Sequence, residues 1–337
     1  MRRSRSGGAL LSDLRCDKIG TIMRPEDDAG EMRKRILVTG ITGQLGHDVM
    51  AELYTRGCEA VGTARRVPEA LQPDAGFVRL DLTDQNAVTD ALERIRPDMV
   101  IHCAGWTAVD AAEEEENREA VYAANVLATG CLAEAAKAVD AGLLYLSTDY
   151  VFDGQGTRPW QPDDRCFAPL NYYGETKLLG EQAVSSALEK YFIVRIAWAF
   201  GLNGKNFIKT MINVGKTHDT VRVVDDQIGT PTYTKDLARL LADMAETDRY
   251  GYYHATNSEE APGAYISWAD LAEEAYRAAG MNTKVARVST EEYGLSKAVR
   301  PFNSRLDKSK LADVGFMPLP RWKDAVRRYI EEAGLRA

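Results

Sequence analysis

Short apolar runs alternate with amphipathic helical patterns along most of the chain. Each run precedes a helical pattern, and the pairs are 36–38 with 45–55, 77–80 with 86–95, and 99–101 with 113–138. A strand that is buried on both faces reads as a short continuous apolar run, and a helix after each strand indicates a parallel sheet. The pattern therefore predicts an α/β fold with a parallel sheet that is covered on both faces.

The alternation continues to Trp198 and then stops. Before that point, strand patterns at residues 142–146 and 192–196 flank a helical pattern at 173–188. Beyond it the apolar spacing is irregular, and a final amphipathic helix begins near residue 321. The change in pattern predicts a second, smaller structural part after the sheet.

Composition excludes several classes of protein. The 337 residues are 45% hydrophobic without an apolar run long enough to span a membrane, so we expect no membrane association. A formal net charge of -8 argues against nucleic acid as a partner. Five scattered cysteines without paired spacing predict reduced thiols in a cytoplasmic protein.

A glycine-rich segment follows the first strand pattern and opens the first helix, with the sequence Gly40-Ile41-Thr42-Gly43-Gln44-Leu45-Gly46. Glycines permit a tight turn there, and the backbone N–H groups at the helix N-terminus suit a pyrophosphate. We therefore expect a doubly wound sheet of the Rossmann type that binds a dinucleotide through Gly40, Gly43, Gln44, Leu45 and Gly46.

The end of the second strand pattern indicates which dinucleotide is bound. A site for NAD(H) usually carries an acidic residue there, whereas this chain has Arg65 and Arg66. Two arginines favour the 2′-phosphate of NADP(H), with use of NAD(H) left open and solvated surface arginines as the alternative. Asp81 and Leu82 are expected beside the adenine, and the inner edge of the cofactor is expected to meet Cys103, Ala104 and Gly105.

The predicted domains follow from these assignments. We expect residues 33–199 to form the dinucleotide-binding domain, with 232–256 returning to it. Residues 200–337 are expected mainly to form a smaller C-terminal cap that binds the substrate over the carboxyl ends of the strands. Residues 1–32 are rich in Arg, Ser and acidic residues and are predicted to be a disordered leader.

Three further residues predict carbonyl reduction. The strand pattern at 142–146 leads to Thr148, and Tyr173 opens a helical pattern that places Lys177 on the same face. Hydride transfer to a ketone creates an alkoxide, which needs a proton donor such as a phenol and a hydrogen bond such as one from Thr148. We expect the Lys177 ammonium to stabilise the phenolate of Tyr173 and so to lower its pKa.

The chain resembles the extended short-chain dehydrogenase/reductase family over residues 35–335. The resemblance is carried by the glycine segment and by six further blocks, which are Thr107-Ala108-Val109-Asp110, residues 147–154, Tyr173-Gly174-Glu175-Thr176-Lys177, residues 194–198, residues 226–232, and Arg300-Pro301 with Asn303-Ser304.

The resemblance implies reduction of the 4-keto group of a dTDP-linked 6-deoxyhexose. It implies that Tyr173 is the proton donor, that Thr148 donates to the carbonyl oxygen, and that Lys177 also binds the cofactor ribose beside Tyr173. Thr107 would approach the nicotinamide. The implied substrate contacts are Val109, Asp149, Tyr150, Trp198 and, for the diphosphate, Arg300.

Other functions of the family remain open. A dehydratase is disfavoured because Tyr150 stands where dehydratases carry a glutamate. Another nucleotide-sugar 4-keto reductase, an epimerase, and a non-catalytic regulatory subunit like the β subunit of methionine adenosyltransferase are the alternatives. The oligomeric state is left open, with a homodimer as one alternative. Some family members bind Mg²⁺ through glutamates at a dimer interface, and because Asp48 takes one of these positions no metal site is predicted.

Overall fold

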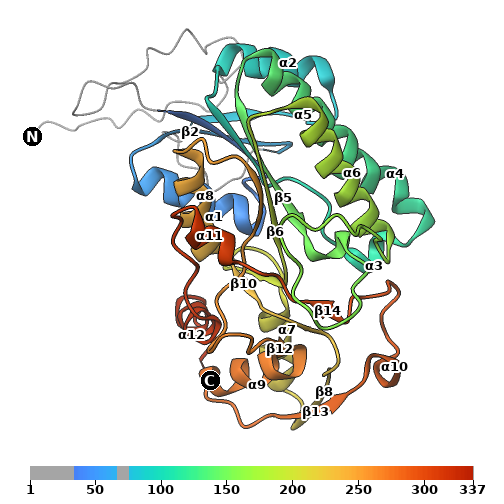
Figure 1. Ribbon diagram of the computed structural model, residues 1–337. Coiled ribbons are helices and arrows are strands. Elements are labelled where there is room, and N and C mark those ends of the chain that lie inside the picture. Colours follow the sequence, from blue (N-terminus) through green and yellow to red (C-terminus); the bar gives the residue numbers. More distant parts are fainter. Residues whose placement is uncertain (1–33, 67–75, 337) are drawn as a thin grey trace, which may run out of the picture. The chain divides into compact units, whose positions relative to one another are not determined.

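A seven-stranded parallel sheet forms the centre of the computed structural model, which describes residues 34–66 and 76–336 (Figure 1). Its order is β11 (Gly251–His254), β6 (Tyr191–Ile196), β5 (Gly142–Thr148), β4 (Met99–His102), β1 (Arg35–Thr39), β2 (Glu59–Ala64) and β3 (Gly76–Arg79). The strand order reverses between β1 and β4, and ligands of such sheets bind at that crevice. The predicted Rossmann-type sheet is confirmed, whereas the predicted leader lies outside the described residues.

Helices cover both faces of the sheet. Figure 1 shows α1 (Gln44–Thr55) and α8 (Thr234–Ala245) on one side and α2 (Gln85–Ile95), α5 (Ala128–Ala138) and α6 (Tyr172–Ala187) on the other. Strands β1, β4 and β5 are buried along their whole length because both faces are covered. Among the described residues no helix has the length and apolar character that a membrane span requires.

The helix predicted over residues 113–138 is wrong at its start. After α3 (Val109–Ala112), the segment contains a 3₁₀ turn (Glu115–Asn117), α4 (Arg118–Tyr122), a π-helical turn (Ala123–Leu127) and then α5. The Glu113 carboxylate accepts the Tyr172 backbone N–H at 2.8 Å, so this acidic residue satisfies the first turn of α6 and does not begin its own helix. The π-helical turn carries Asn125 into the interior, where it is buried.

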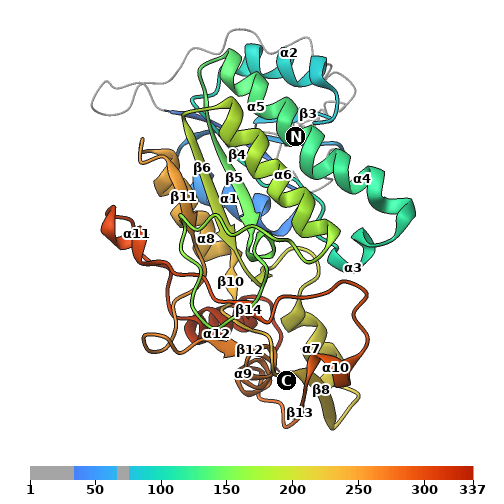
Figure 2. The ribbon, with the colours of Figure 1, turned by 45° about the vertical axis from the view of Figure 1, so that its right-hand side comes forward.

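The region after β6 builds small sheets and a second apolar core. The elements, in part visible in Figure 2, are β7 (Ala199–Phe200), α7 (Phe207–Gly215), β8 (Thr220–Val224), β9 (Ile228–Gly229), β10 (Thr232–Tyr233), β12 (Ile266–Ser267), α9 (Trp268–Ala279), β13 (Lys284–Val288), α10 (Thr290–Tyr293), β14 (Asn303–Ser304), α11 (Ser309–Asp313) and α12 (Trp322–Glu332). Strand β9 lies between β12 and β14, and β8 pairs with β13. Residues from α7, α9 and α12 share one core, while α8 packs on α1 and β11 extends the main sheet.

Candidate active site

The glycine turn between β1 and α1 has no room for side chains. Gly40 has φ of +70°, and a Cβ atom there would lie 2.6 Å from the backbone nitrogen of Ala104. A Cβ atom on Gly46 would lie 2.3 Å from the Gly40 carbonyl oxygen. These close approaches bring the turn against β4 and the start of α1 against β1, which leaves backbone N–H groups at the sheet crevice.

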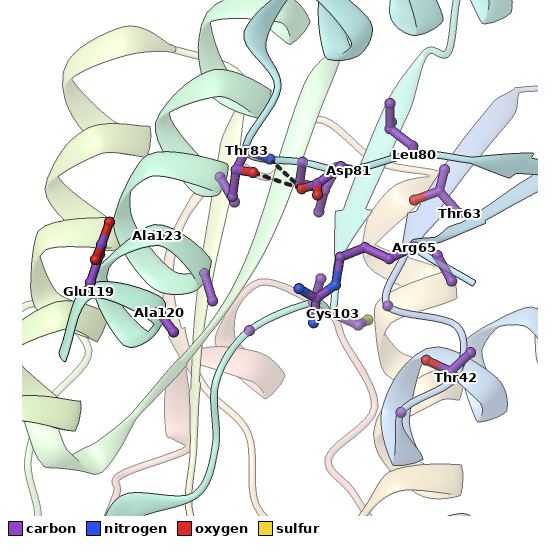
Figure 3. Close-up of a pocket in the computed structure, with 18 of the residues that line it drawn as sticks. Thr42, Thr63, Arg65, Leu80, Asp81, Thr83, Cys103, Glu119, Ala120 and Ala123 are labelled. Atoms are coloured by element: carbon purple, nitrogen blue, oxygen red, sulfur yellow. Dashed lines mark hydrogen bonds between the residues drawn. The ribbon is translucent and has the colours of Figure 1, made fainter. Parts of the chain in front are cut away.

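A cavity of about 590 Å³ runs from this turn along the carboxyl ends of the strands. Figure 3 shows the Arg65 side chain extended into it and Asp81 hydrogen-bonded to Thr83. The predicted cofactor residues that line it are Gly40, Gly43, Arg65, Asp81, Leu82, Cys103, Ala104 and Gly105. The structure thus brings together residues from four strand ends that are far apart in the sequence.

The remaining predicted cofactor residues do not line this cavity. Arg66 lines an adjoining hollow of about 720 Å³ together with Thr42, Arg65, Arg79 and Asp81. Leu45 packs on the main core, and Thr107 is exposed. Hydrogen bonds from the Thr83 backbone and hydroxyl lower the pKa of Asp81, and burial raises the pKa of Cys103 to about 12. Asp81 is therefore a carboxylate and Cys103 a neutral thiol near pH 7.

Gln44 and its neighbours connect the glycine turn to the region after β6. The Gln44 amide donates to the Lys205 carbonyl oxygen at 3.1 Å. The Asn203 amide donates to the carbonyl oxygens of Thr42 at 2.9 Å and Gly43 at 3.4 Å. The turn is therefore held from its outer side by a loop of the C-terminal region.

Thr148 and Tyr173 meet at the carboxyl end of β5, and Lys177 contacts the same strand. Thr148 is the last residue of β5, its hydroxyl is hydrogen-bonded to Tyr173, and it donates to Asp149 Oδ1 at 3.0 Å. Asn171 caps α6 by accepting the Gly174 N–H at 2.8 Å, which fixes the helix that carries Tyr173 and Lys177. Lys177 Nζ donates to the Leu146 carbonyl oxygen at 2.6 Å and lies 4.1 Å from the centre of the Tyr145 ring.

The predicted lowering of the phenol pKa is wrong for this structure. Burial raises the pKa of Tyr173, and the hydrogen bond with Thr148 opposes this only in part. Burial also lowers the pKa of Lys177 to about 7, because the ammonium is 7% exposed and its desolvation outweighs attraction to Glu181. Desolvation therefore dominates the electrostatics of the site, and Tyr173 is a neutral phenol able to donate a proton.

Asp149 and Tyr150 flank the phenol. Asp149 is 1% exposed, and burial raises its pKa to about 6. Hydrogen bonds with Ser304 and Thr148 lower this pKa, but burial has the larger effect. The Tyr150 ring meets the Tyr173 ring edge to face at 5.6 Å between centres. Burial raises the pKa of Tyr150 to about 12, so its hydroxyl also stays protonated near neutrality.

The other predicted substrate residues lie on the C-terminal side of the site. Trp198 has φ of +51° and stacks on Trp268 with ring centres 4.0 Å apart. The Arg300 guanidinium donates to Asp110 Oδ2 at 2.6 Å and to the Tyr150 hydroxyl at 3.3 Å. A cavity of about 300 Å³ is lined by residues that include Asp110, Gln227, Trp268, Tyr293 and Arg300. Val109, the first residue of α3, is half-buried beside Asp110.

Two buried residues at the site were not predicted. Asn125 Oδ1 accepts the Trp106 N–H at 2.7 Å and its amide donates to Thr176 Oγ1 at 3.0 Å, which joins the turn after β4 to α6. The His102 ring lies between the hydroxyls of Thr39 at 2.7 Å and Thr129 at 3.1 Å. Burial lowers the pKa of His102 to about 3, so this histidine is neutral and fixes β4 against β1.

Asp48 makes an internal contact. The Thr234 hydroxyl donates to its Oδ2 at 2.5 Å, and His47 Nδ1 lies 3.3 Å from its Oδ1. Across residues 34–66 and 76–336 no group of three or more His, Cys, Asp or Glu side chains could hold a metal ion.

An α/β sheet that presents a hydroxyl, a phenol and an amine beside a nucleotide-sized cavity defines a dinucleotide-dependent oxidoreductase. The chain belongs to the family described as the RmlD substrate binding domain, whose family model matches residues 33–335.

Individual relatives agree with this family. The chain is 41% identical to dTDP-4-dehydrorhamnose reductase of Streptomyces griseus, over 87% of this chain and 92% of that protein. It is 33% identical to the spore coat polysaccharide biosynthesis protein SpsK of Bacillus subtilis, over 88% and 97%. The crystal structure of dTDP-4-dehydrorhamnose reductase from Bacillus anthracis in complex with NADP has a TM-score of 0.80 at 36% identity, covering 89% of this chain and all of that one.

Proposed function

We propose that this protein uses NADPH to reduce the 4-keto group of dTDP-4-dehydro-6-deoxy-L-mannose, also called dTDP-4-dehydrorhamnose, to give dTDP-L-rhamnose. The observation that carries the proposal is the cluster of Thr148, Tyr173 and Lys177 at the sheet crevice. The names of the relatives from Streptomyces griseus and Bacillus anthracis support the substrate, and the latter's complex supports NADP(H).

The residues around the crevice suit a dinucleotide. Gly40 and Gly46 occupy positions where a Cβ atom would clash, and the N-terminus of α1 that follows the turn has no side-chain cap among the described residues and would suit a pyrophosphate. Arg65 and Arg66 would face a 2′-phosphate, while Asp81 and Leu82 would flank the adenine. When bound, the reduced nicotinamide supplies the hydride. Weaker use of NADH is part of the proposal, because an adenosine ribose without the phosphate fits the same cavity.

Tyr173 would then protonate the oxygen that becomes negative at the sugar C4. Its raised pKa keeps the proton on the phenol until the alkoxide, a much stronger base, forms. Thr148 has one hydroxyl hydrogen, and in the structure it donates this hydrogen to Asp149. The hydroxyl must therefore rotate before Thr148 can donate to the carbonyl oxygen of the sugar. Lys177 would hold the nicotinamide ribose.

The sugar would lie between the two halves of the site. Val109, Asp149, Tyr150 and Trp198 would contact the sugar, and Arg300 would bind the diphosphate after exchanging its contact with Asp110. Guanidinium groups bind phosphate oxygens through paired N–H donors, which makes this exchange favourable. We also propose a cytoplasmic location, which the thiols of Cys103, Cys131 and Cys166 support because they form no disulfide among the described residues. A homodimer is a further proposal that light scattering would test.

Turnover with enzymatically made dTDP-4-dehydrorhamnose tests the function. NADPH absorbance should fall only when the sugar is present, and dTDP-rhamnose should form. Replacing Tyr173 by phenylalanine should reduce kcat by roughly 10²-fold or more, because the acid is removed. Tyr172→Phe is the matched control, since that hydroxyl donates to the Arg118 carbonyl oxygen at the surface. Near-normal turnover in Tyr173→Phe would exclude the mechanism, and interconversion of sugars without net oxidation of NADPH would indicate an epimerase.

A further inference from the structure

A third arginine borders the hollow that Arg65 and Arg66 line. Arg79 is the last residue of β3, and its register partner on β2 is Ala64. Arg65 and Arg66 follow Ala64 directly, so three guanidinium groups gather around one hollow of about 720 Å³. Arg79 therefore belongs to β3, whereas Arg65 and Arg66 follow β2.

The backbone holds Arg79 in place at this hollow. Its Nε donates to the Arg65 carbonyl oxygen at 3.1 Å, which uses one of the five N–H donors of the guanidinium. The two terminal nitrogens make no further hydrogen bond within the described residues. A guanidinium fixed through Nε presents its terminal N–H pairs as a fork, which is the geometry that phosphate oxygens accept.

None of these three arginines forms a salt bridge in the part of the chain that the structure describes. Several other arginines are paired, as Arg287 is with Asp225, Asp270 and Glu273. Like charges that share one site repel one another, so an unpaired cluster of guanidiniums is a site for an anion. Arg65, Arg66 and Arg79 are all exposed, and their charged groups remain accessible.

The charge of the hollow matches a phosphate monoester. Three arginines contribute +3 and the Asp81 carboxylate contributes -1, which leaves +2. A phosphate monoester carries about -1.5 to -2 at neutral pH. The Asp81 carboxylate is already bonded to the Thr83 backbone and hydroxyl at 3.0 and 2.8 Å, so it does not neutralise the arginines through a close ion pair.

We infer that Arg79 completes the site for the 2′-phosphate of NADP(H) and is a determinant of selectivity for NADP(H) over NAD(H). This inference extends the proposed function. It requires from that function only that the adenosine half of a dinucleotide occupies the cavity. Recognition by three guanidiniums from two strands places the phosphate between β2 and β3. Selectivity is then set partly by a residue fourteen positions beyond Arg65.

Calorimetric titration with adenosine 2′,5′-bisphosphate and with 5′-AMP tests the inference, because these ligands differ only in the 2′-phosphate. Arg79→Met should weaken binding of the bisphosphate by about 10- to 100-fold, which is the range for one charge-assisted hydrogen-bonded contact. Binding of 5′-AMP should not change. Arg79→Lys keeps the charge without the fork and should give an intermediate loss for the bisphosphate.

Arg327→Met is the matched control, since Arg327 lies on α12 and pairs with Asp324 at the surface. It should bind both ligands like the original chain. Equal losses for the bisphosphate and 5′-AMP in Arg79→Met would show a merely structural role, and an unchanged bisphosphate affinity would overturn the inference directly. The titration contains no sugar and no turnover, so failure of the proposed reduction would leave its result standing.

Discussion

Replacing Lys177 by methionine should stabilise the protein while it abolishes turnover. The amine is 7% exposed, and burial lowers its pKa from 10.5 to about 7. A folded-state pKa below the unfolded-state value means that the unfolded chain binds more protons between those two values. The cost of burying this amine is therefore fully present at or below pH 7 and declines as pH rises toward 10.5.

The size of the effect follows from the two pKa values. Linkage gives a cost of about 4 kcal/mol at pH 7 and about 2 kcal/mol at pH 9, since one pKa unit corresponds to about 1.4 kcal/mol. Methionine removes this cost but also loses the hydrogen bond to the Leu146 carbonyl oxygen and the contact with the Tyr145 ring, together about 1–3 kcal/mol. We expect a net gain of about 1–3 kcal/mol at pH 7 that shrinks by about 2 kcal/mol at pH 9.

Urea unfolding at pH 6, 7, 8 and 9, followed by circular dichroism, measures this difference. Subtracting the free energy of unfolding of the original protein from that of Lys177→Met cancels the contributions of the other groups that titrate. Lys190→Met is the matched control, because the Lys190 side chain pairs with Asp140 at the surface, and this substitution should change the free energy of unfolding little. A Lys177→Met protein that is less stable than the original at every pH, or a difference that does not shrink, would refute the argument that desolvation governs the site.

Two further substitutions test the packing around the site. Gly46→Ala should destabilise the fold by more than 1 kcal/mol and weaken nucleotide binding, because its Cβ atom would lie 2.3 Å from the Gly40 carbonyl oxygen. Gly130→Ala is the control, because a Cβ atom there would meet no atom within 4 Å. In thermal unfolding this control should be neutral or stabilising by up to about 1 kcal/mol. Glu181→Gln should cost about 3–5 kcal/mol in urea unfolding, since it leaves the buried guanidinium of Arg195 without its ion-pair partner at 2.8 Å. A loss below 1 kcal/mol for Glu181→Gln would contradict that burial argument.

Local patterns sufficed to predict the sheet and the glycine turn. Apolar runs identify buried strands, and Gly40 and Gly46 stand where backbone approaches backbone, which only glycine allows. Thr148 and Tyr173 could be predicted together because each lies at the end of a predicted element. The proposed catalytic residues could therefore be inferred from their positions next to strand and helix ends.

Contacts between distant segments could not be predicted in this way. Arg79 reaches the hollow through the pairing of β2 with β3, and Asn125 lies in the middle of a helical pattern whose π-helical turn leaves no sequence signal. The pKa of Tyr173 is raised, whereas the sequence predicted that it would be lowered. The spacing of Tyr173 and Lys177 along the helix predicts that they share a face, but it contains no information on burial. Desolvation is a property of the whole packed interior.

The hydrogen bonds from the Asn203 amide to the carbonyl oxygens of Thr42 and Gly43 connect the glycine turn to the region after β6. A ligand that shifts this turn must also shift the loop that contains Asn203, which leads directly into α7 and one wall of the second cavity. If binding in the first cavity moves the turn in this way, it also changes the affinity of the second cavity, and thermodynamics requires that influence to be mutual.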